Sequence, residues 1–212
     1  MKAQRKIFVG SLALLAAAGL VGCSSGHEAS PDRAAAAVVT YEADYPSYES
    51  IDDLIENADI VVKGTVVTTR VEELMPEVSQ EQDPEINPQA GLEPDEGAQM
   101  QPVVETISTV RVSEVLSGDI SPGGIIEVAQ LRGTVGEITY KESKTETLVS
   151  GDSEYLFMLA AHGEGAPYDL LNPAQALYTV DGAEQVTAVG EDGFTDLGTV
   201  GELSERIERA AP

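Results

Sequence analysis

The chain has 212 residues, of which 37 are acidic and only 12 are basic, and its formal net charge is −25 at pH 7. This excess of acid argues against nucleic acid as a partner, because phosphates are bound by Lys and Arg. It also disfavours electrostatic docking on anionic lipid headgroups.

The N-terminus has the features of an export signal. Three basic side chains in the first six residues precede an uncharged, mainly apolar run over residues 7–21, shorter than the about 20 residues of a membrane-spanning helix. The run ends in "LVGC" at residues 20–23, which resembles the lipobox of bacterial lipoprotein precursors. The resemblance implies a thioether-linked lipid on Cys23 and a signal peptide over residues 1–22, cleaved immediately before that cysteine.

Lipidation of Cys23 predicts a location at the cell membrane, on its extracytoplasmic face. The diacylglycerol group that the resemblance implies has two acyl chains, which together form a stable anchor. The modification also uses the only thiol of the chain, so no disulfide can form within it. The "GCSSG" stretch at residues 22–26 fits the G-x-S-x-G hydrolase motif, but it spans the cleavage site and is discarded.

Residues 23–46 begin with small and polar side chains and predict a flexible tether. The remaining residues, 47–212, have the length of a single domain. A capping pattern at Ser50 and apolar residues at helical spacing over 51–58 predict a short helix. The β-branched residues over 60–71 then predict a strand.

Residues 72–103 differ in composition from the rest of the domain. They contain no Lys or Arg, nine acidic residues and five prolines. Such a segment cannot bury enough apolar surface to offset the entropy of ordering it, so it predicts a disordered acidic loop inserted into the domain. The loop is a candidate site for a basic protein or for cations, and such binding is expected to weaken with salt.

Strand patterns resume after the loop. Residues 154–161 form a continuous apolar run that predicts the central, most buried strand. The fold class predicted is mainly β, of the α+β type: a small antiparallel barrel or sandwich of about six to seven strands, with a short helix near the start and one at the C-terminus. The other predicted elements are strands over 104–119, 125–132 and 137–142, a hairpin over 176–180 and 185–189, and a helix that begins after Thr199.

Three segments resemble a pattern of uncharacterised exported bacterial proteins: "IDDLIENADIVVKGTVV" from Ile51, "TVRVSEVLSGD" ending at Asp119, and "GDSEYLFML" at residues 151–159. The pattern is distantly similar to OB-like barrels of the netrin and metalloproteinase-inhibitor type. Those inhibitors act through an N-terminal cysteine and disulfides. This chain lacks the disulfides, so the resemblance implies a barrel and no inhibitory activity.

Catalytic motifs are absent from the sequence, and no catalytic residue is assigned. His27 lies in the tether, and His162 follows the long apolar run in a loop. A Ser-His-Asp arrangement would combine His162 with a serine such as Ser150 or Ser153 and an acid, and only geometry can identify one. No phosphate-binding glycine loop and no zinc spacing occurs, so no cofactor and no metal is assigned.

Two other segments carry groups suited to a ligand. Asp192 and Asp196 flank a glycine, but they lack the ligand ladder of a calcium loop. In "PYDLLNPAQALY", Asn172 predicts a turn with the proline after it. Tyr168 and Tyr178 are expected to pack on the barrel with their hydroxyls outward.

Together these observations predict a cell-envelope lipoprotein whose domain is a non-enzymatic binding or structural module, with the membrane as its partner through Cys23. Two alternatives stay open. One is an envelope hydrolase that uses His162, and the other is a calcium-dependent binding module.

Overall fold

The computed structural model describes residues 37–75 and 101–210, which belong to one compact unit. The lipobox with Cys23, His27 and most of the predicted acidic loop lie outside the described residues. Neither helix in the described part is long and apolar enough to cross a membrane.

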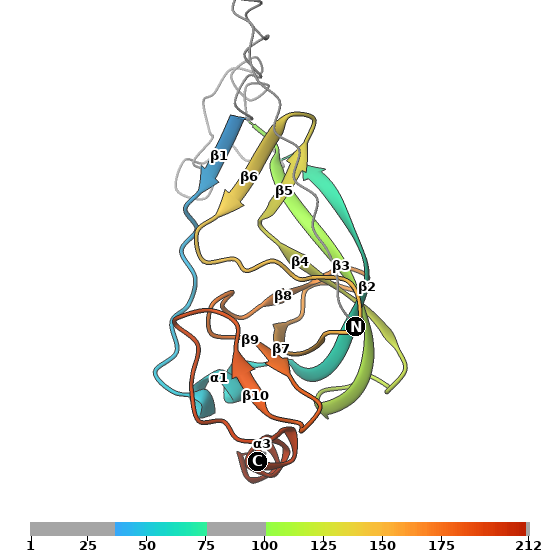
Figure 1. Ribbon diagram of the computed structural model, residues 1–212, viewed down its shortest axis with the longest axis vertical. Helices are drawn as coiled ribbons and strands as arrows, with labels where there is room; N and C mark the ends of the chain where they lie inside the picture. The colour runs from blue at the N-terminus through green and yellow to red at the C-terminus, as the bar shows by residue number, and fades with distance from the viewer. Residues whose placement is uncertain (1–36, 76–100, 211–212) are drawn as a thin grey trace, which may run out of the picture. The chain divides into compact units, whose positions relative to one another are not determined.

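The described chain is mainly β, as the sequence predicts, with two sheets and two helices (Figure 1). The helices are α1 (Ile51–Asn57) and α3 (Val200–Ala210). The strands are β1 (Ala37–Tyr41), β2 (Ile60–Leu74), β3 (Val103–Ser117), β4 (Ile125–Gln130), β5 (Arg132–Val135), β6 (Ile138–Glu142), β7 (Glu154–Ala160), β8 (Tyr168–Leu170), β9 (Leu177–Val180) and β10 (Val186–Ala188).

The larger sheet closes on itself. Its strand order is β10-β9-β7-β2-β3-β4-β8, and β8 also pairs with β7. The pairings therefore form a ring of five strands, β7-β2-β3-β4-β8, in which only the β4–β8 pair is parallel. This ring is a small barrel rather than a sandwich, and β9 and β10 extend the sheet outward from β7.

The barrel core is most continuous along β7. Leu156, Phe157, Met158 and Leu159 are fully buried, which confirms the prediction of a highly buried strand. β7 is not the middle strand of the sheet, because β2 occupies that position in the strand order.

Gly64 in β2 marks both a bulge and a close approach. The pairing of β2 with β3 shifts register between Lys63 and Gly64. A Cβ atom on Gly64 would lie 2.7 Å from the carbonyl oxygen of Arg111 and 2.7 Å from Cγ1 of Val110. The two strands can come this close only because residue 64 has no side chain.

The two helices form as their capping and apolar patterns predict. The side chain of Ser50 accepts a hydrogen bond from the backbone N–H of Asp53 at 3.1 Å, which caps α1. Both helices place their apolar side chains in the core: Ile51, Leu54 and Ile55 from α1, and Val200, Leu203 and Ile207 from α3.

The predicted tether over residues 23–46 is too long, because Ala37–Tyr41 form β1. This strand pairs in parallel with β6, and the hydroxyl of Tyr41 accepts a hydrogen bond from the backbone N–H of Val104 at 2.9 Å. The Tyr41 ring also stacks on Tyr140. The composition of residues 37–41 does not reveal their partner, which lies far along the chain.

Two further boundaries differ from the prediction. The predicted loop over 72–103 is wrong at both ends. β2 continues through Leu74, and β3 already begins at Val103, which pairs with Leu74. The predicted strand over 125–132 divides at Leu131 into β4 and β5. The reason is that β5 leaves the barrel and joins β1 and β6 in a three-stranded sheet of order β1-β6-β5.

Candidate functional site

A cavity of about 370 Å³ opens at one end of the barrel. Four strands meet there: β3 near its start, β4 and β7 at their ends, and the short strand β8. Its volume falls within the range of small-molecule sites, roughly 300–1,000 Å³. The lining residues are Tyr45, Pro46, Glu105, Gln130, Leu131, Thr145, Ala160, His162, Asp169, Leu170, Leu171 and Pro173.

One wall of the cavity comes from the segment between β1 and α1, part of which was predicted to be tether. Asn172 donates a hydrogen bond from Nδ2 to the carbonyl oxygen of Pro46 at 2.8 Å. Gln175 accepts from the backbone N–H of Tyr48 at 3.0 Å and donates to its carbonyl oxygen at 3.1 Å. These bonds place Tyr45 and Pro46 against the barrel.

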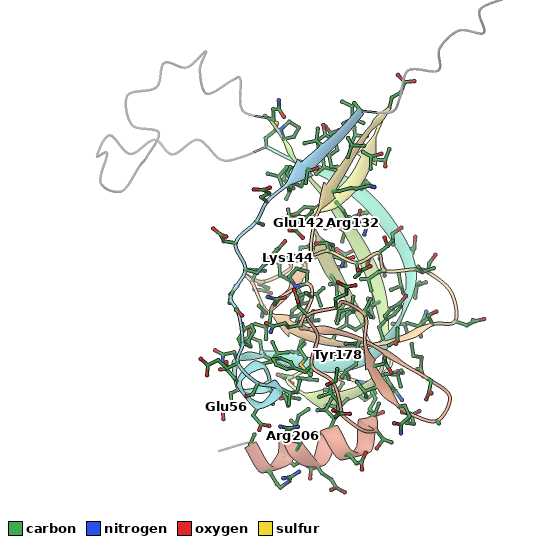
Figure 2. The ribbon with its side chains drawn as sticks, turned by 60° about the vertical axis from the view of Figure 1, so that its left-hand side comes forward. Glu56, Arg132, Glu142, Lys144, Tyr178 and Arg206 are labelled. Atoms are coloured by element: carbon green, nitrogen blue, oxygen red, sulfur yellow. The ribbon has the colours of Figure 1, made fainter. Side chains whose placement is uncertain are left out.

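A second wall is the turn after β6, which Figure 2 shows around Glu142, Lys144 and Arg132. Glu142 is only 4% exposed. Its carboxylate accepts hydrogen bonds from the backbone N–H of Lys144 at 2.8 Å and the hydroxyl of Thr145 at 2.9 Å. Arg132 donates a hydrogen bond to the carbonyl oxygen of Thr145 at 3.3 Å. These contacts hold Thr145 at the edge of the cavity.

His162 lies in the loop between β7 and β8 and lines the cavity. Its Nε2 atom lies 2.8 Å from Oδ2 of Asp169 on β8, and both side chains are about half exposed. The loop begins at a fixed point, because the backbone N–H of Ala161 donates to Asp59 at 2.7 Å. Because His162 and Asp169 both line the cavity and are half exposed, they can contact a bound molecule.

The serines considered as partners of His162 lie elsewhere. Ser150 and Ser153 precede β7 and His162 follows it, so the whole strand, roughly 20 Å at the usual rise per residue, separates them. The Ser-His-Asp arrangement with either serine is therefore wrong.

The charged groups of the cavity are predominantly negative. Burial raises the pKa of Glu105 above its ordinary value, and the negative charges of Asp169 and Glu72 raise it further. Burial also raises the pKa of Tyr45, as do the nearby carboxylates of Glu142, Asp169 and Glu105. No Lys or Arg is among the described residues that line this cavity.

Gln130 contributes an amide to the lining. Its side chain is buried, with 5% of the residue exposed. The Nε2 atom donates to the carbonyl oxygen of Glu146 at 3.0 Å, whereas Oε1 has no hydrogen-bond partner within the described part of the chain. A buried carbonyl oxygen without a donor is costly, and because this oxygen is shielded from solvent a ligand reaches it only if the amide turns toward the cavity.

The segment over residues 167–178 is only partly as predicted. Asn172 does form a turn, because its Oδ1 accepts from the backbone N–H groups of Ala174 and Gln175. The hydroxyl of Tyr178 is not directed outward as expected. It is buried and donates to the carbonyl oxygen of Gln175 at 2.6 Å.

No three His, Cys, Asp or Glu side chains gather into a metal site anywhere in residues 37–75 and 101–210. This includes Asp192 and Asp196, the pair considered for calcium. The described part of the chain therefore contains no cluster of three such side chains for the calcium-dependent alternative.

Sequence reasoning identified His162 but not the residues around it. Tyr45, Glu105, Gln130 and Asp169 come from four separate segments, and none belongs to a motif. Only the closure of the barrel brings them together. No protein-family model matches this chain, and no curated protein matches it.

Proposed function

We propose that this protein is a lipid-anchored lipoprotein of the cell envelope whose barrel binds a small molecule in the cavity at its end. The observation that carries the binding function is the cavity itself. It combines apolar walls with a few polar groups, as ligand sites do. OB-like barrels, which the sequence distantly resembles, are also five-stranded, and they bind ligands on one face and in the neighbouring loops.

The binding function is tested with the full-length protein, purified in a neutral detergent, and a library of small molecules. We expect some compounds to raise the melting temperature of the wild type, because a ligand that binds only the folded state stabilises it. Ala160→Phe should fill the cavity and abolish these shifts. Ala183→Phe, at an exposed position between β9 and β10 and outside the cavity, is the control, and shifts that persist unchanged in Ala160→Phe contradict the proposal.

The location is tested by labelling cells with a modified fatty acid. We expect the wild-type protein to take up the label and to sediment with membranes, whereas Cys23→Ala does neither. Ser24→Ala serves as the control and should behave like the wild type. Label on the Cys23→Ala variant would contradict anchoring through this residue.

A second candidate function is hydrolysis, and the contact between His162 and Asp169 favours it. A histidine oriented by a carboxylate can act as general base toward water. We expect an activity of this kind to be lost in His162→Ala and strongly reduced in Asp169→Asn. An ester or amide hydrolysis that survives His162→Ala would exclude this mechanism.

A further inference from the structure

We propose that the cavity binds an organic cation: a molecule with an ammonium or related positively charged group on an apolar body of modest size. This inference rests on the proposed binding function and names the ligand class. Three independent features of the lining support it.

The first feature is the charge of the cavity. Glu105 and Asp169 line it, and Glu72 and Glu142 are close enough to act on the pKa values of lining groups. The only lining side chain that can become positive is His162, and it already contacts Asp169. An anionic ligand would meet repulsion from Glu105 and Asp169, whereas a cation would relieve the repulsion between these carboxylates.

The second feature is the apolar surface beside these charges. Six apolar residues line the cavity: Pro46, Leu131, Ala160, Leu170, Leu171 and Pro173. A hydrated metal ion could not use this surface, and the described residues provide no metal ligand set. An organic molecule can bury its body against it, which is favourable in proportion to the apolar area removed from water.

The third feature is an acceptor without a donor. Gln130 is buried and lines the cavity, and its Oε1 has no partner among the described residues. This atom is shielded from solvent, so an N–H group of an ammonium ligand would supply the missing hydrogen bond once the amide turns toward the cavity. Tyr45, on the adjacent wall, adds an aromatic ring, and the faces of such rings attract cations.

A second cavity, of about 300 Å³, provides a contrast. It lies between strands β2 and β3 on one side and β5 and β6 of the three-stranded sheet on the other, and Gln130 borders it as well. Arg132 lines this second cavity, and no carboxylate does. A cation is therefore expected to occupy the cavity of Glu105 and Asp169 and not this one.

The test uses four probes that share an aromatic body and differ in charge: benzyltrimethylammonium and benzylamine as cations, benzyl alcohol as the neutral probe and phenylacetate as the anion. Affinities are measured by titration calorimetry on the full-length protein in a neutral detergent. We expect both cations to bind about tenfold more tightly than benzyl alcohol, and phenylacetate not to bind. Benzylamine carries N–H donors and should exceed the quaternary cation if Gln130 accepts from the ligand.

Glu105→Gln and Asp169→Asn should each lower the affinity for the cations about tenfold and leave the affinity for benzyl alcohol unchanged. Asp192→Asn removes a charge from an exposed position outside the cavity and should change neither. Melting temperatures of all variants establish that they are folded. Ala160→Phe should remove the binding of every probe, which locates it in this cavity.

The outcomes separate the two proposals. If benzyl alcohol or phenylacetate binds as tightly as the cations, and Ala160→Phe abolishes this binding, the ligand class is wrong and the binding function stands. If cation selectivity survives in both Glu105→Gln and Asp169→Asn, the ligand class is again wrong. If no probe binds in a way that Ala160→Phe removes, both proposals lose their support.

Discussion

Tyr178 is fully buried, and the hydrogen bond from its hydroxyl to Gln175 closes the turn that precedes β9. Burial raises the pKa of this phenol, because the interior disfavours its charged form. The same turn contains Asn172, which holds Pro46 at the cavity. A buried hydroxyl in the core therefore stabilises one wall of the candidate site.

Tyr178→Phe is expected to lower the free energy of unfolding by about 1–2 kcal/mol, because it removes the hydroxyl and leaves the carbonyl of Gln175 without its donor. Urea denaturation measures this change. Tyr168→Phe is the matched control, since this partly buried tyrosine makes no side-chain hydrogen bond within the described residues, and it should change stability little. Equal effects of the two substitutions would show that the bond contributes nothing.

At the scale of secondary-structure elements, α1 and α3 contact each other through an ion pair. Arg206 donates to Asp52 from Nη2 to Oδ2 at 2.9 Å, and Figure 2 shows Arg206 on α3 next to α1. The hydrogen bond from Arg206 holds the pKa of Asp52 below its ordinary value. Asp52 is about half exposed, so solvent weakens the pair and it contributes well under 1 kcal/mol.

Because the pKa of Asp52 is lower in the folded protein than in the unfolded chain, the pair stabilises the fold fully above the ordinary aspartate pKa. Its contribution is lost as the pH falls through the lowered value. Asp52→Asn should therefore cost about 0.5 kcal/mol at neutral pH and progressively less in acid. Parallel urea titrations of wild type and variant measure the difference, with Glu208→Gln on the exposed face of α3 as control. A cost that stays constant with pH would contradict the assignment.

The elements that the sequence predicted well are those whose signals are local. Ser50 and the apolar stripe after it define α1, and the turn at Asp181-Gly182 defines the β9–β10 hairpin. β1 was missed because its partner, β6, lies far along the chain. β5 pairs with β6 across a short turn, but it follows β4 after a single residue, so the sequence does not show where one strand ends and the next begins.

The candidate site was predictable only at His162. Its position after the most buried strand was visible in the sequence, but Asp169 carries no local signal that marks it as the partner. Glu105 was assigned to a strand and Tyr45 to a tether, and nothing in their neighbours distinguishes them from the other acids and tyrosines of the chain. Their proximity results from ring closure through the β4–β8 and β7–β8 pairings, a non-local property.

At the scale of the whole molecule, the fold begins at β1 and not at the predicted boundary of residue 47. A chain that starts at residue 47 lacks β1, the Tyr41 contacts with β3 and β6, and Tyr45 and Pro46 of the cavity wall.

We expect the chain from residue 47 to melt at a lower temperature than one from residue 36, and to lose the binding of benzylamine. Calorimetric melting and titration measure both properties. A third chain from residue 30 is the control for length alone and should match the chain from residue 36. Equal melting and binding from residue 47 would show that β1 and the segment after it are dispensable.

The position of β1 also limits how far the barrel can stand from the lipid, if Cys23 is anchored as proposed. Fourteen residues lead from Cys23 to Ala37, and a fully extended chain of this length spans at most about 50 Å. A tether that ended at residue 46 would have reached considerably further. The cavity would therefore stay within a layer of limited depth next to the membrane, where molecules held at the lipid surface or released from it can reach it as well as dissolved ones.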